Sequence, residues 1–224
     1  MRDVGIAMEL VPSALAVDPG RLCSMKVHLT NDGPDARDVA VELPSEDRDW
    51  SWVHPEFCSV TPGEEAVVDV FFKPRCGPHP TAGTHTVDIV ARAAGDATVA
   101  AQGRGTVDVG TYVDAAGHLD PMVAYDHMAS SYRFHLENRG NIPVTAELCT
   151  EDPSGALHVA VEPARLSAGP GETATATVSV QARKKLKRGE HTYRVCVLAQ
   201  VEGGSDLRIE GAFRQQGAKP AKVR

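Results

Sequence analysis

Hydrophobic and polar residues alternate along much of the chain with a period of two. Near the amino terminus, for example, Met25, Val27 and Leu29 alternate with the polar Lys26 and His28, as they do in a strand with one face on a core and the other in water. Turns rich in proline and glycine separate short segments of this kind. The pattern predicts strands at residues 5–11, 23–30, 37–43, 65–72, 85–93, 97–109, 121–126, 131–137, 143–150, 156–161, 173–181, 190–200 and 206–214.

The sequence repeats itself once, at an offset of 106 to 108 positions. The segments HLTNDG (28–33), TPGE (61–64) and GTHT (83–86) return in the same order as HLENRG (135–140), GPGE (169–172) and GEHT (189–192). Because order and spacing are both preserved, the chain contains two copies of one domain. We expect the first domain at residues 1–110, the second at 111–216, and a basic, flexible tail at 217–224.

Each copy has the length and strand spacing of a small two-sheet domain. Short strands separated by turns every eight to twelve residues, over about a hundred residues, are typical of an antiparallel sandwich of the immunoglobulin type. The sequence therefore predicts an all-β protein with two tandem immunoglobulin-like antiparallel β-sandwiches. The repeated Asn-x-Gly (31–33, 138–140) and Pro-Gly (62–63, 170–171) segments are expected at corners, where residues must tolerate a positive φ.

Composition and charge exclude several classes of protein. The 224 residues include 20 Gly and 15 Pro, which excludes a helical bundle. A net charge of -7 argues against wholesale binding to nucleic acid, and the charge divides into -8 for residues 1–110 and +1 for residues 111–224. No run of apolar residues is long enough for a signal peptide or a membrane helix, so we expect a cytoplasmic protein.

The five cysteines are expected to be reduced, because their number is odd, their spacing is irregular and no export signal precedes them. A disulfide between Cys149 and Cys196 is the alternative that the sequence leaves open.

Motifs of catalysis and metal binding are missing from the sequence. There is no Gly-x-Ser-x-Gly, phosphate-binding loop, His-Glu-x-x-His or Cys-x-x-Cys. The nearest arrangement to a zinc site is His54, Cys58, Cys76 and His79, but Cys58 lies among apolar residues and is better interpreted as a core residue. We expect no enzyme activity, no cofactor and no bound metal.

The strongest concentration of charge lies between two predicted strands of the second copy. Five of six consecutive residues there are cations: Arg183, Lys184, Lys185, Lys187 and Arg188. An acidic protein face is the partner that such a loop favours, ahead of lipid headgroups or phosphates. A solvated loop without a partner is the alternative.

Trp50 and Trp52 form a second candidate binding patch. They are two positions apart, so in an extended segment both side chains are expected to face the same way. An exposed pair would stack on a sugar ring or bind a partner, whereas a buried pair would fill the core or cover an edge.

Several motifs carry a resemblance to a known family. They are Val17–Gly20, Asn31–Gly33, Val60–Gly63, Pro78–Gly83 and Leu207–Gln215. Over nearly its whole length the chain resembles tandem immunoglobulin-like proteins of high-GC Gram-positive bacteria that are often labelled "hydrolytic protein". It is distantly similar to the immunoglobulin-like modules appended to bacterial glycosidases, which are not known to have a catalytic centre. The resemblance implies, for several members, a membrane helix after the second domain.

Together these patterns predict a non-enzymatic scaffold or adaptor that binds a protein partner through its loops and sheet faces. Two alternatives are an accessory or membrane-docking component of an assembly such as a phage-tail-like contractile injection system, and a carbohydrate-binding module. Association with a membrane would then come from a partner or from a further C-terminal segment. The partner's identity and the oligomeric state stay open.

Overall fold

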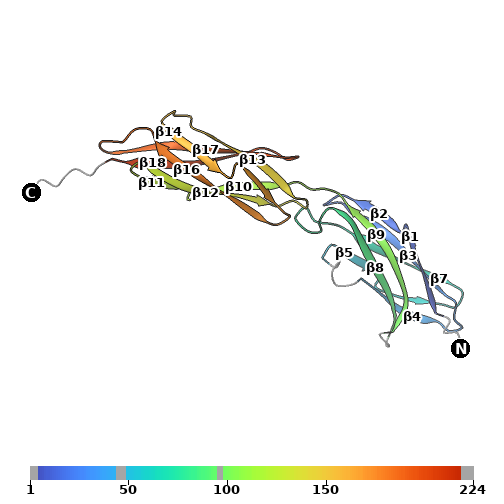
Figure 1. Ribbon diagram of the computed structural model, residues 1–224. Helices are drawn as coiled ribbons and strands as arrows, with labels where there is room; N and C mark the ends of the chain where they lie inside the picture. Colours follow the sequence, from blue (N-terminus) through green and yellow to red (C-terminus); the bar gives the residue numbers. More distant parts are fainter. Residues whose placement is uncertain (1–4, 44–48, 95–97, 218–224) are drawn as a thin grey trace, which may run out of the picture. The chain divides into compact units, whose positions relative to one another are not determined.

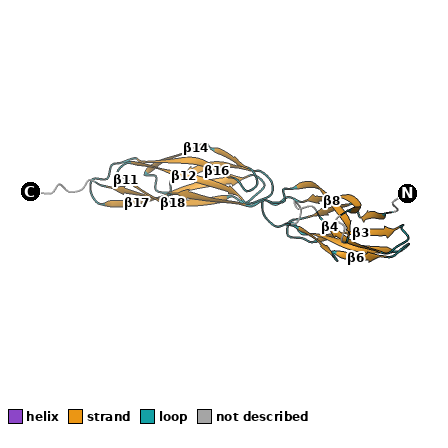
Figure 2. Cartoon of the chain, turned by 90° about the horizontal axis from the view of Figure 1, so that it is seen from below, coloured by secondary structure: helices purple, strands orange, loops and turns teal. Residues whose placement is uncertain are grey.

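The computed structural model describes residues 5–43, 49–94 and 98–217. Strands joined by loops make up these ranges, and Figure 2 shows no helix among them. The chain divides into two compact units, Met1–Tyr112 and Val113–Arg224, whereas the sequence placed the boundary after residue 110. Residues 218–224 of the predicted tail lie outside the described residues. The fold class is confirmed: each unit is an immunoglobulin-like β-sandwich.

The first unit consists of a four-stranded and a five-stranded sheet (Figure 1). The strand orders are β1-β3-β7-β5 and β2-β9-β8-β4-β6. The strands are β1 (Ile6–Val11), β2 (Ala14–Val17), β3 (Cys23–Asn31), β4 (Arg37–Glu42), β5 (Ser51–His54), β6 (Phe57–Val60), β7 (Glu65–Phe72), β8 (Gly83–Ala93) and β9 (Val99–Val109).

The second unit has the same topology, with orders β10-β12-β16-β14 and β11-β18-β17-β13-β15. Each strand of the first unit corresponds to the strand nine places later, so the repeat in sequence is a repeat in strand order. The strands are β10 (Ala115–Asp120), β11 (Val123–Asp126), β12 (Ala129–Asn138), β13 (Val144–Glu151), β14 (Leu157–Glu162), β15 (Arg165–Ala168), β16 (Thr173–Ala182), β17 (Glu190–Val201) and β18 (Leu207–Gln216).

In both units the chain crosses between sheets at equivalent places. Two of these crossings lead from β1 to β2 and from β5 to β6 in the first unit, and their counterparts lead from β10 to β11 and from β14 to β15 in the second. A cis proline stands at each of these four: Pro12, Pro55, Pro121 and Pro163. After the first crossing, β2 and β11 pair in parallel with β9 and β18.

The sequence pattern missed five strands, namely β2, β5, β6, β10 and β15. All but β10 are only four residues long, which is too short to show a period of two. The glycine and the two alanines in β10 give it little apolar pattern.

The two sheets of each unit enclose a core of inward-facing apolar side chains. In the first unit Val27, Val68 and Val87 are fully buried, and in the second Phe134 and Phe213 are. These positions lie in the alternating segments from which the strands were predicted, so burial of one strand face explains the alternation.

Asn31, at the end of β3, is fully buried and holds a corner of the first sandwich together. Its side-chain Nδ2 donates to the backbone carbonyls of Asp35 and Val60, both at 2.8 Å. Its Oδ1 accepts the backbone N–H of Gly33 at 2.9 Å. The side chain therefore joins the turn after β3 to the end of β6 in the opposite sheet.

Asn138 makes the equivalent contacts in the second sandwich. Its Nδ2 donates to the carbonyls of Ile142 at 2.8 Å and Ala168 at 2.9 Å, and its Oδ1 accepts the N–H of Gly140 at 2.9 Å.

The two Asn-x-Gly segments therefore lie at corners, as expected, but neither Gly33 nor Gly140 has the expected positive φ. Their asparagines are strand residues whose side chains bond across the sandwich. Positive φ occurs instead in the Pro-Gly segments, at Gly63 (71°) and Gly171 (74°). There the backbone N–H of each glycine donates to the carbonyl of the asparagine in its own unit.

Candidate functional site

The cationic segment of the second unit lies in the loop between β16 and β17, as predicted. We call residues 183–188 the basic loop. Its five cationic residues are all exposed, and no ion pair with a described carboxylate involves them. Arg183 differs from the other four, because its Nε donates to the carbonyl of Leu157 at 2.8 Å and is thus tied to β14.

A buried glutamine fixes the backbone of the basic loop. Gln215, near the end of β18, is fully buried. Its Nε2 donates to the carbonyls of Lys184 and His127, both at 2.9 Å, and its Oε1 accepts the hydroxyl of Tyr193 at 3.2 Å. A buried amide satisfied in this way is costly to displace, so the loop is held in one position before any partner arrives.

Gln215 also bonds to the turn after β11, at His127, and the carboxylate of Asp126 orders this turn. The Asp126 side chain accepts the backbone N–H groups of Met128 at 3.1 Å and Ala129 at 3.4 Å. The Met128 N–H, followed by that of Ala129, lowers the pKa of Asp126, because both hydrogen bonds favour the charged carboxylate. Asp126 is therefore ionised at neutral pH and supports the turn on which Gln215 rests.

The two tryptophans do not face the same way, which corrects the expectation from their spacing. Trp50 lies before the first residue of β5, is only 7% exposed, and packs against Phe72 with ring centroids 5.6 Å apart. Trp52 lies within β5, is 45% exposed, and stacks on Phe71 at 5.4 Å. Because Trp50 is outside the strand, the alternation of a strand does not apply to it; it belongs to the core.

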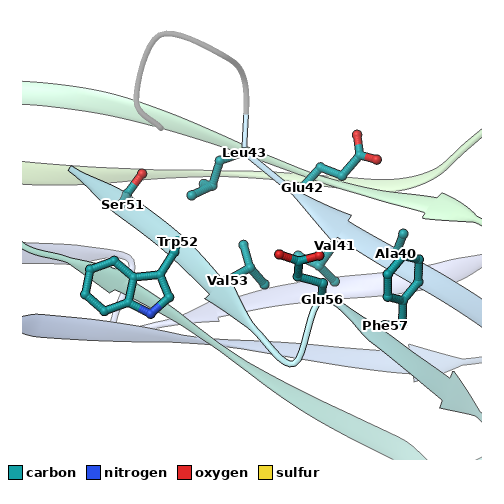
Figure 3. A pocket seen from close by; sticks show the side chains of 9 residues that line it. All are labelled: Ala40, Val41, Glu42, Leu43, Ser51, Trp52, Val53, Glu56 and Phe57. Carbon is teal, nitrogen blue, oxygen red and sulfur yellow. The ribbon is translucent and has the colours of Figure 1, made fainter. Parts of the chain in front are cut away.

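A hollow of about 350 Å³ opens between β4, β5 and β6. Figure 3 shows Trp52 and Phe57 at opposite ends of it, with Val53 and Leu43 between them. The Glu56 carboxylate lies between Val53 and Phe57, and the Glu42 carboxylate points away from them, so both apolar and acidic side chains line this hollow (Figure 3). Glu42 is paired with Arg92.

The loop between β7 and β8, residues 73–82, occupies the same place in the first unit as the basic loop does in the second. It contributes Lys73 and Arg75 to a hollow of about 530 Å³ that Trp52 and Asp49 also line. Both cations are exposed. Lys73 and Arg75 do not stand out in the sequence, because Pro74 separates them and they form no run of charge. The signal that could have found them is their place in the repeat, which matches that of the basic loop.

The cysteines are free thiols in the structure. Cys149 is exposed and Cys196 buried, on neighbouring strands, and burial raises the pKa of the Cys196 thiol. Among the residues described, the structure gathers no group of three or more metal ligands, so His54, Cys58, Cys76 and His79 are not brought together. No helix in the same part of the chain is long and apolar enough to cross a membrane.

No family model matches this chain, and no curated protein matches it. The solved structures that match include the D00-D0 domain of intimin, at 13% identity and a TM-score of 0.41 over 92% of this chain and 99% of that one. A protein of unknown function from Porphyromonas gingivalis W83 matches at 11% identity and a TM-score of 0.34, over 93% and 99% of the two chains. The YadV chaperone matches at 12% identity and a TM-score of 0.35, over 94% and 99%.

These identities and TM-scores are too low to bear on function. The label "hydrolytic protein" and the link to glycosidase modules find no support among the matches.

Proposed function

We propose that the protein is a non-enzymatic scaffold or adaptor that binds an acidic face of a protein partner through the basic loop. The supporting observation is the combination of exposed cations without carboxylate partners and a loop backbone anchored by the buried Gln215. An anchored loop loses little conformational entropy on binding, so more of the electrostatic attraction contributes to affinity.

The positive charge of the basic loop is the reason for proposing an acidic partner. Cations on a loop attract a negatively charged surface over about a Debye length, roughly 8 Å at physiological salt. Lys184, Lys185, Lys187 and Arg188 are the groups we assign to this contact, because the Arg183 guanidinium is partly used within the fold. Trp52 is available as a second contact, and the buried Trp50 is not.

The experiment is capture of partners from a native lysate of the source cells, with soluble and membrane fractions kept separate and bound proteins identified by mass spectrometry. The test variant is Lys184→Gln/Lys185→Gln/Lys187→Gln/Arg188→Gln. The matched control changes charge equally at exposed cations outside the loop: Lys26→Gln/Arg104→Gln/Arg133→Gln/Arg194→Gln.

We expect an acidic protein, or a set from one assembly, to bind the natural chain and the control and to elute with salt. The purified partner should bind the test variant at least about tenfold more weakly and with a flatter salt dependence. Binding that is equally tight and equally salt-sensitive in the test variant would show that the basic loop is not the docking surface.

A further inference from the structure

One corner of the first unit combines an exposed aromatic ring with charged side chains, whereas the basic loop has charge alone. Its residues are Trp52, Phe71, Lys73, Arg75 and Asp49. Trp52 stands on β5, the last strand of its sheet, directly opposite Phe71 of β7. The two rings stack with centroids 5.4 Å apart and planes inclined by 19°. Phe71 therefore supports one side of the indole, and among the residues that the structure describes no further strand pairs with β5 on its other side.

Such a supported and exposed aromatic ring is a flat apolar platform in water. The C–H faces of a pyranose ring pack on platforms of this kind, and the rigid indole loses little entropy when they do. The neighbouring hollows, about 350 and 530 Å³, both have Trp52 in their lining. Each is large enough for a sugar residue, which favours a carbohydrate over a bare ion.

Two cations stand beside this platform on a fixed backbone. Lys73 comes two positions after Phe71, and its backbone N–H continues the ladder by donating to the carbonyl of Trp50 at 2.7 Å. The next residue, Pro74, accepts the N–H of Gly20 at 2.7 Å, so the segment is held from both sides. In the part of the chain that the structure describes, no ion pair involves Lys73 or Arg75.

The charges of the corner indicate what kind of sugar it binds. A carboxylate is the natural counterpart of an arginine and a lysine that form no ion pair with a described carboxylate. Asp49 lines the same hollow and offers an acceptor for sugar hydroxyls. A strand of nucleic acid also stacks on aromatic rings, but it needs many phosphate contacts, whereas this hollow is lined by two cations.

We propose that this corner is a binding site for an acidic glycan, with a uronic or sialic acid ring on Trp52 and its carboxylate against Arg75 and Lys73. This site is independent of the basic loop, on the other unit of the chain. A protein with both sites would join a carboxylated polysaccharide to an acidic protein.

The test is isothermal titration of the full chain with acidic oligosaccharides: trigalacturonate, a mannuronate trimer, a hyaluronan tetrasaccharide and 3'-sialyllactose. Maltotriose and lactose are the neutral counterparts, and oligothymidylate represents nucleic acid. The variants are Trp52→Ala, Trp52→Phe and Lys73→Gln/Arg75→Gln. The controls are Tyr125→Ala, which removes an exposed aromatic ring of the second unit, and the fourfold basic-loop variant, which separates this site from the proposed adaptor function.

We expect at least one acidic oligosaccharide to bind in the micromolar to millimolar range. Lys73→Gln/Arg75→Gln should weaken it at least about tenfold, Trp52→Ala should abolish binding, and Trp52→Phe should retain part of it. Both controls should bind as the natural chain does. The proposal is overturned if no acidic oligosaccharide binds at 10 mM, if binding survives Trp52→Ala, or if oligothymidylate binds the same corner more tightly than every sugar tested.

Discussion

Asn31 and Asn138 connect a turn to the opposite sheet with three hydrogen bonds each, to equivalent backbone groups. An amide is suited to this position because it donates to two carbonyls and accepts one N–H at once. Neither aspartate, which cannot donate, nor leucine, which can do neither, would satisfy the same buried backbone groups.

We predict that Asn31→Ala destabilises the first unit by about 2 to 4 kcal/mol, because it leaves two carbonyls and one N–H without their partner. The measurement is the midpoint of urea unfolding followed by fluorescence of the tryptophans, both of which lie in that unit. Asp32→Ala is the control, since Asp32 is the exposed neighbour in the same turn. A loss below 0.5 kcal/mol for Asn31→Ala would contradict the assigned role.

At the scale of elements, the position of the basic loop depends on a strand that is distant in sequence. Gln215 on β18 bonds to Lys184 in the loop after β16 and to His127 in the turn after β11. The loop's own residues form no regular structure. Its order therefore comes from strands that are distant in sequence, β18 through Gln215 and β14 through the bond from Arg183 to Leu157.

Replacing Gln215 by an apolar residue of similar size tests that dependence. Gln215→Leu removes both donors and leaves the carbonyls of Lys184 and His127 unsatisfied, at an expected cost of about 2 to 3 kcal/mol. Hydrogen exchange should accelerate in residues 127–129 and 183–188 and stay unchanged throughout the first unit. Unchanged exchange in the basic loop would mean that other contacts hold it.

How much could be predicted from sequence also differs between elements. The long strands were predictable because one of their faces is buried, which imposes alternation over eight or more residues. The four-residue strands β2, β5, β6 and β15 were not, because pairing with a neighbouring strand, rather than local pattern, makes them strands. The direction of the Trp50 side chain was mispredicted for a different reason: the strand begins at Ser51, so alternation within a strand does not relate Trp50 to Trp52.

Candidate binding residues could be predicted where they are adjacent in the sequence, and could not where only the fold brings them together. Five cations in six positions of the basic loop are visible in the sequence. The corner around Lys73 and Arg75 is assembled from β5, β7 and the following loop, and only the fold brings it together.

The whole molecule has two separate cores, one in each unit, with no buried residue in common. Each unit has about the size at which a single sandwich folds alone. Charge is divided just as clearly, at -8 and +1 for the two halves of the sequence. The two units therefore share the same arrangement of core strands but differ in the charge of their surfaces.

We predict that residues 5–112 and 113–217, expressed separately, each fold cooperatively. The far-ultraviolet circular dichroism of the two pieces should sum to that of the full chain, and each should show one thermal transition. Asn138→Ala should then lower the transition of the second piece. A piece without a cooperative transition would show that its sandwich needs the rest of the chain.

The two proposed binding sites involve the same connection of the sandwich, the loop from β7 to β8 in one unit and the loop from β16 to β17 in the other. Because the strands that flank this connection are equivalent, loops of different length and charge are displayed at the same place in each unit. Residues 183–189 grafted between β7 and β8 would carry the cations to the other unit, but not the Gln215 side chain that anchors them. In a chain of this kind, new specificity requires a changed loop together with one supporting residue on a neighbouring strand, as Gln215 of β18 and Trp52 of β5 illustrate.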